Sequence, residues 1–206
     1  MTDGACSDCR QENVTKSQKL VVLSISTEWF SMRGGVSTIN RELCIALRRL
    51  GHTVVCAIES PTLEEIQNAR SNGIRLIPPS YQPGYDRHQA LGVPLSLPDG
   101  IRPDVIIGHG LHSGPAAMLQ QRSLPGTYRI HFIHVDSGAI EPHKDHQDHG
   151  TRADAKTLDE KLLASSADLV VGIGPRLYKA ASHLVLGAMP KPVLLRLDPA
   201  PARIVR

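Results

Sequence analysis

Short apolar runs alternate with amphipathic segments along most of the chain. The apolar runs are rich in Val, Ile and Leu and are only six to nine residues long, which is typical of strands buried on both faces of a parallel sheet. On this pattern, strands are expected at 19–26, 52–58, 74–79, 103–110, 128–136, 167–174 and 192–197.

Helical spacing fills most of the intervals between these runs. Within 36–50 the apolar residues recur every three or four positions, and Gly51 is a natural helix stop. We expect the core face of this helix to carry Val36, Ile39, Leu43, Leu47 and Leu50, with Cys44 and Ala46 beside it. Further helices are expected at 62–73, 113–121, 152–165 and 175–187. The proline-rich stretch 78–103 predicts a long irregular connection with one short helix near 87–91.

Strands that alternate with helices indicate right-handed βαβ units. We therefore predict an α/β fold, a doubly wound and mostly parallel Rossmann-like sheet of about seven strands, over residues 18–198. Residues 1–17 are polar and are expected to form a mobile leader, and 199–206 a tail. Such sheets bind ligands beyond the carboxyl ends of their strands. That rule selects the segments 27–37, 108–114, 136–150 and 174–176.

Composition excludes several classes of protein. The net charge of +3 is small, and Lys and Arg are dispersed, which does not favour a nucleic-acid-binding protein. No apolar run is long enough to cross a membrane. Cys44 and Cys56 lie in apolar patterns and are expected in the core, whereas the Cys6–Cys9 pair lacks a second ligand pair for zinc. Reduced thiols without a signal peptide predict a cytoplasmic protein.

Gly34 and Gly35 stand between the first predicted strand and the first predicted helix. Bare amides at a helix N-terminus bind anions, and glycines let a ligand approach the backbone closely. Turn geometry alone is the alternative explanation, because the spacing matches neither a dinucleotide fingerprint nor a P-loop. The adjacent Arg33 either neutralises a phosphate or is simply solvated.

Histidines close two of the predicted strands. His109 and His134 should lie at the same edge of the sheet, where each is either a site residue or a structural strand end, whereas His131 should be packed inside its strand. Asp136 follows His134 by two residues. The run of His143, His146 and His149 with interleaved aspartates could chelate a divalent ion, but we favour a flexible loop and predict no metal site. These histidines are His109, His131, His134, His143, His146 and His149.

Four stretches in this order resemble a known family. They are RGGVSTINRELCIALRRLGHTVVCAI, RPDVIIGHG, IHFIHVD and LDEKLLASSADLVVGIGPRLYKA. Together they are similar to the N-terminal, acceptor-side domain of GT-B glycosyltransferases of the family-4 type, and they cover about 19–197. The resemblance implies retaining transfer from a nucleotide-sugar co-substrate to a sugar or lipid acceptor, without another cofactor.

The same resemblance assigns roles to the candidate residues. Gly34 and Gly35 would approach the donor phosphate or the acceptor, and His134 would lie near the reacting sugar as the catalytic residue. His109 would line the same cleft. Asp136 would hold the ring of His134 or bind acceptor hydroxyls.

GT-B enzymes have a second domain that binds most of the nucleotide, and this chain ends where the linker to it would begin. We therefore expect the chain to be inactive alone and to self-associate through its exposed cleft face. Two alternatives stay open. One is a non-catalytic module, derived from such a domain, that binds a glycan or a partner. The other is half of a nucleotide-sugar epimerase.

Overall fold

The computed structural model describes residues 18–31, 35–136, 139 and 149–198, and the structural statements below concern these residues. Their strands form one sheet in the order β3-β2-β1-β4-β5-β6-β7, and every neighbouring pair is parallel. The strands are β1 (Val21–Ile25), β2 (Thr53–Ala57), β3 (Arg75–Ile77), β4 (Val105–His109), β5 (Tyr128–Ile133), β6 (Leu169–Ile173) and β7 (Val193–Leu197). The predicted fold class and all seven predicted strands are confirmed.

Helices connect consecutive strands on both faces of this sheet. They are α1 (Gly35–Arg49), α2 (Leu63–Ser71), α3 (Arg87–Ala90), α4 (Gly110–Ser123), α6 (His149–Ser165) and α7 (Gly174–Leu184), with a 3₁₀ turn at Pro98–Gly100. The predicted start of α4 at residue 113 is three residues late. Gly110 has a φ of +48°, which turns the chain from β4 directly into the helix without a loop.

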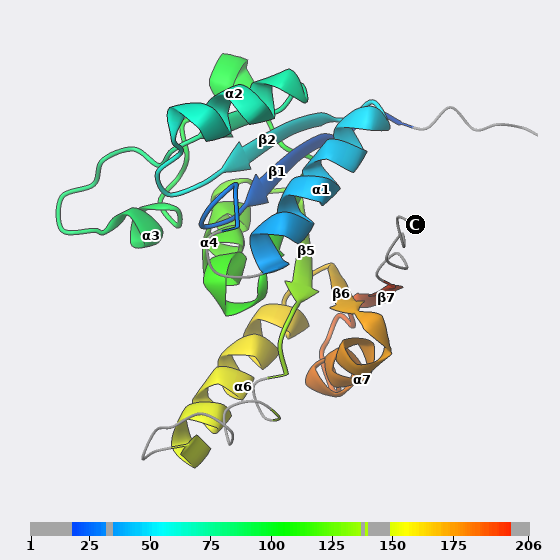
Figure 1. The fold of residues 1–206 in the computed structure, drawn as a ribbon. Helices are drawn as coiled ribbons and strands as arrows, with labels where there is room; N and C mark the ends of the chain where they lie inside the picture. The colour runs from blue at the N-terminus through cyan, green and yellow to red at the C-terminus, as the bar shows by residue number, and fades with distance from the viewer. Residues whose placement is uncertain (1–17, 32–34, 137–138, 140–148, 199–206) are drawn as a thin grey trace, which may run out of the picture.

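The core has two layers, one on each face of the sheet. On one face, α1 and α2 pack their buried Cys44, Ile45 and Ala69 against β1, β2 and the centre of the sheet. On the other face, α4 packs Ala116 and Ala117 against the same strands, and α6 and α7 cover β5 and β6. Figure 1 shows α1 and α4 on opposite sides of β1. The core is mostly aliphatic, as expected from an aromatic content of 3%, with Trp29 and Phe132 as its buried aromatic residues.

The buried face of α1 differs from the predicted one. Its buried residues are Ser37, Asn40, Cys44 and Ile45, whereas Leu50 lies past the helix end and is 72% exposed. Leu43 and Leu47 are only partly buried at the margin of the core. The predicted face was wrong because it counted apolar residues only, whereas Ser37 and Asn40 are buried with hydrogen-bond partners inside the protein, which offsets the cost of burying them.

Parallel pairing brings the carboxyl ends of the strands to one edge, called the carboxyl-terminal rim below. The arrowheads of β1, β2 and β5 point toward this side in Figure 1. The rim carries residues 26–31 after β1, His109 at the end of β4, and 134–136 after β5. The first turns of α1, α4 and α7 also begin there. The fold therefore gathers at one edge most of the segments that the sequence marked for ligand binding.

Candidate functional site

Two histidines from neighbouring strands meet at the rim. His109 Nδ1 lies 2.9 Å from His134 Nε2, and the two ring centroids are 5.1 Å apart. His109 is wholly buried, whereas His134 is partly exposed. The backbone N–H of His109 donates to Ser113 Oγ at 2.9 Å, which fixes the junction between β4 and α4. The predicted proximity of these two strand ends is therefore seen, and His134 is the member of the pair that faces outward.

A buried polar chain continues inward from this pair. His109 Nε2 lies 3.1 Å from Asn40 Oδ1, and the same amide oxygen accepts a hydrogen bond from Ser24 Oγ. The Asn40 amide nitrogen lies 3.5 Å from Cys56 Sγ. Both ring nitrogens of His109 thus have hydrogen-bond partners inside the protein, so this histidine holds His134 from the buried side.

Burial sets the charge state of the pair. It lowers the pKa of His109 well below the ordinary value, and His134 and His131 add to this effect. Burial also lowers the pKa of His134 to about 4, with smaller contributions in the same direction from His131 and His112. Both rings are therefore neutral near pH 7, so each can donate from one nitrogen and accept at the other.

His131 lies inside β5, as predicted for a packed residue. It is fully buried, and its Nε2 lies 2.7 Å from Glu160 Oε1 of α6. A Cβ at Gly114 would come within 2.8 Å of the His131 ring, so the glycine is needed for the close approach of α4 to β5. Among the described residues, His131 Nδ1 is the buried side-chain nitrogen or oxygen for which no hydrogen-bond partner is found.

Asp136 borders a cavity beside α6 and α7. It lines an open cavity of about 290 Å³ between α6, α7 and the segment after β5, together with Thr157, Glu160, Lys161 and His183. Its Oδ1 accepts from the backbone N–H of Ala139 at 3.3 Å. The His134 ring lies near the rings of His109 and Phe132. Both roles expected for Asp136, holding the ring of His134 or binding acceptor hydroxyls, stay predictions.

Gly35 opens α1 at the rim and is exposed. A Cβ built on it would meet nothing within 4 Å, and its φ lies outside the left-handed region. Neither packing nor backbone conformation within the described structure therefore requires glycine at this position. The neighbouring candidates Gly34 and Arg33 lie outside the described residues.

Glu65 holds the segment that leads to this glycine. Its carboxylate accepts hydrogen bonds from the backbone N–H groups of Trp29, Phe30 and Thr62, at 3.2, 2.9 and 2.8 Å. Burial raises the pKa of Glu65, but the N–H groups of Phe30 and Thr62 outweigh it and leave the pKa below the ordinary value. Sequence reasoning missed this residue, although the spacing of Thr62 and Glu65 is a capping box.

The other expectations from the sequence are partly testable. Cys44 and Cys56 are buried free thiols, as predicted for core residues. The described part of the chain holds no group of three or more His, Cys, Asp or Glu that could bind a metal ion. His143 and His146 lie outside the described residues, as do Cys6 and Cys9, and His149 is described only as the first residue of α6.

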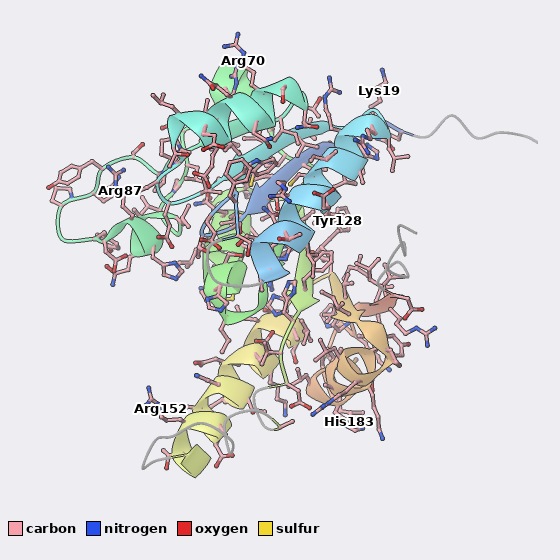
Figure 2. The ribbon with its side chains drawn as sticks, viewed as in Figure 1. Lys19, Arg70, Arg87, Tyr128, Arg152 and His183 are labelled. Atoms are coloured by element: carbon pink, nitrogen blue, oxygen red, sulfur yellow. The ribbon has the colours of Figure 1, made fainter. Side chains whose placement is uncertain are left out.

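The charge distribution agrees with the composition. Figure 2 shows the labelled basic side chains Lys19, Arg70, Arg87 and Arg152 on well-separated parts of the molecule, and no two of them share a helix or strand. None of the described helices is both long and apolar enough to be a membrane span.

Comparison with known proteins assigns the family. The sequence model described as "Family 4 Glycosyltransferase in conflict systems" matches residues 23–205, nearly the whole chain. The chain belongs to this family. The resemblance to family-4 glycosyltransferases is thereby confirmed, whereas no curated protein matches this glycosyltransferase domain significantly.

Solved structures show the same fold for this glycosyltransferase domain. Sucrose-phosphate synthase from Thermosynechococcus elongatus superposes with a TM-score of 0.58 at 15% identity, over 87% of this chain and 48% of that one. UGT89C1 of Arabidopsis thaliana in complex with UDP gives a TM-score of 0.55 at 15% identity, over 91% of this chain and 50% of that one. The domain thus spans about half the length of these structures and has the GT-B half-fold.

Proposed function

We propose that this domain is the acceptor-side half of a retaining glycosyltransferase, which moves a sugar from a nucleotide-sugar donor to a sugar or lipid acceptor. Family membership and the GT-B half-fold support the proposal. One protein of that fold, UGT89C1, has been solved in complex with UDP and also with UDP-L-rhamnose. The observation that carries the proposal is the neutral, partly exposed His134 at the carboxyl-terminal rim, held from behind by His109.

His134 has the chemistry that this role needs. A neutral imidazole can hydrogen-bond a sugar hydroxyl without attracting the diphosphate away from its own site. In the proposed reaction the bond from the anomeric carbon to the diphosphate oxygen breaks, and the acceptor oxygen bonds that carbon on the same face. The nucleoside diphosphate leaves with the bonding electrons, and its departing oxygen takes up the proton that the acceptor hydroxyl loses. His134 orients the sugar for this step.

Gly35 supplies the second part of the proposed site. Since the described structure gives no internal reason for glycine there, close approach of a ligand to the first turn of α1 is the reason that we propose. The free N–H groups of that turn favour a phosphate or a hydroxyl oxygen. Gly34, Arg33 and Asp136 remain proposed substrate-binding residues, with Asp136 at the margin of the site.

We further propose that the 206-residue chain does not turn over by itself. It covers about half of the GT-B structures that it resembles, so the nucleotide would gain only part of its contacts here. Self-association through the exposed cleft face and a cytoplasmic location belong to the same proposal. The free thiols of Cys44 and Cys56 are compatible with a reducing compartment.

Titration of the ¹⁵N-labelled chain with UDP-glucose, UDP and free glucose tests the proposal. We expect the Gly35 amide and the His134 ring signals to move with a Kd on the order of 1 mM, and no sugar transfer or hydrolysis. Shifts confined to surfaces away from the rim, or the absence of any shift with a panel of nucleotide sugars, would contradict a donor-contacting site. Turnover by the chain alone would refute only the proposal that the chain is inactive by itself.

A further inference from the structure

The hydrogen-bond chain behind His134 has a fixed direction. An amide oxygen can only accept, and Asn40 Oδ1 lies 3.1 Å from His109 Nε2, so that nitrogen must carry a proton. Ser24 Oγ donates to the same oxygen and keeps it oriented toward His109. Asn40 is fully buried on α1, so its amide has no water with which to exchange these contacts.

The protonation of His109 Nε2 also fixes the hydrogen bond between His109 Nδ1 and His134. Because His109 is neutral and protonated at Nε2, its Nδ1 has a lone pair and accepts from His134 Nε2 across 2.9 Å. A neutral His134 that donates from Nε2 then has a bare Nδ1 on the other side of its ring. His134 is the partly exposed member of the pair, at the rim, whereas His109 is fully buried.

We propose that Asn40 and His109 are positioning residues that hold His134 in the Nε2–H tautomer, so that its Nδ1 lone pair accepts a hydrogen bond from a ligand hydroxyl at the rim. The role in ligand binding rests on the proposed function, whereas the tautomer does not. A bare nitrogen attracts the hydroxyl of a sugar and repels the oxygens of a phosphate. His134 therefore serves the sugar or the acceptor, and the diphosphate contacts the first turn of α1 or the other half of a GT-B cleft.

The free-energy cost of burying an asparagine in a helix supports a role for Asn40 beyond packing. Asparagine is a weak helix former, and its amide must be fully satisfied when it is buried in a core. A Val or Leu would suit this buried position on α1, which packs against Cys44 and Cys56, more simply. Asn40 instead joins the first strand to the histidine that backs the rim, through Ser24 on one side and His109 on the other.

Long-range ¹H–¹⁵N correlation of the histidine rings in the 206-residue chain at pH 7, without ligand, tests the tautomer directly. The His134 ring is identified by the loss of its signals in His134→Gln. We expect its Nδ1 to resonate as a bare nitrogen and its Nε2 as a protonated one. The opposite assignment, or an even mixture of the two tautomers, would overturn the proposal, even if nucleotide sugars bind.

Substitutions separate positioning from general stability. Asn40→Val removes the acceptor for His109, and the His134 tautomer should then change, with Nδ1 moving toward the protonated range. Asn40→Asp keeps an acceptor oxygen and should preserve the wild-type pattern, and it serves if Asn40→Val does not fold. Asn68→Val is the matched control, because Asn68 Oδ1 accepts its hydrogen bond from Trp29 Nε1, at 2.9 Å, rather than from a histidine. An unchanged His134 pattern in folded Asn40→Val would sink the proposal.

If the tautomer is found as expected but no nucleotide sugar binds, the proposed function fails and the positioning chain stands. If a nucleotide sugar binds but His134 is in the Nδ1–H tautomer, the positioning role of Asn40 and His109 is refuted and the proposed function stands. The two inferences can thus be decided separately.

Discussion

His109 and His134 are joined ring to ring across 2.9 Å, and only the second is open to the rim. They lie 25 residues apart, at the ends of adjacent parallel strands. The pairing makes His134 both a surface group and the last member of a buried hydrogen-bond chain. Substitution of His134 should therefore be felt in the stability of the domain as well as in ligand binding.

His134→Ala should lower the free energy of unfolding by about 1–2 kcal/mol, because it leaves His109 Nδ1 buried without its donor. His134→Gln, whose side-chain amide can still donate, should retain most of the stability. His88→Ala is the control, since His88 is exposed on α3 and its Nδ1 contacts Glu59 at 2.8 Å. Urea denaturation at pH 7 measures all three. Equal stability of His134→Ala and wild type would mean that the two rings are not bonded in solution.

The domain should lose stability as the pH falls from 6.5 to 4. In that interval the unfolded chain protonates His134 and His109 near their ordinary pKa of 6.5, whereas the folded pKa of His134 is about 4 and that of His109 is also lowered. The unfolded state then binds more protons, so the free energy of unfolding decreases with falling pH. For His134 the loss amounts to at most about 3 kcal/mol, and it is complete below pH 4.

Denaturant midpoints measured between pH 7 and pH 4 check this dependence. His134→Gln should show a shallower pH slope than wild type, because one of the titrating rings is gone. The charged and titratable groups around the pair are His131, with its partner Glu160, and His112. A pH slope that is the same in wild type and in His134→Gln would show that the His134 pKa is not lowered on folding.

The sheet could be predicted because its signal is local. Runs such as Val21–Ile25 and Val105–His109 are mostly apolar, which is typical of strands covered on both faces. The helix boundaries were less certain. Gly110 follows a strand and suggests a loop, yet with a positive φ it opens α4 itself. The sequence does not distinguish a glycine in a loop from a glycine that begins a helix, and only the tertiary structure decides between the two.

The candidate site was predictable only where topology alone defines it. Parallel strands must end at one edge, so His109 and His134 could be placed together from the sequence. Asn40 could not, because a polar residue within an amphipathic helix is expected to face solvent. Its partners Ser24 and His109 are 16 and 69 residues away, and nothing in the local pattern points to them. Glu65 was missed for the same reason.

Glu65→Ala should destabilise the domain by about 3 kcal/mol, because three backbone N–H groups lose their acceptor. Glu64→Ala, one residue earlier and exposed, should cost less than about 0.5 kcal/mol. Since the folded pKa of Glu65 lies below its ordinary value of 4.5, this contribution is present above pH 4.5 and is lost as the pH falls through the folded pKa. Thermal and urea unfolding of both variants test this. Similar losses in the two would refute the assigned contacts.

Gly35→Ala should separate a ligand-binding glycine from a structural one. A methyl group there meets nothing within 4 Å and the φ is not left-handed, so the free energy of unfolding should change by less than about 0.5 kcal/mol. The same methyl would stand where we propose that a phosphate or hydroxyl approaches the backbone, so nucleotide-sugar binding should weaken at least about tenfold.

The control is Gly172→Ala, whose Cβ would overlap the backbone of Tyr178 and should destabilise the fold. Calorimetric unfolding and NMR titration of both variants give the two readouts. Full ligand affinity in Gly35→Ala would remove Gly35 from the proposed site, whereas a large loss of stability would show that the glycine is structural after all.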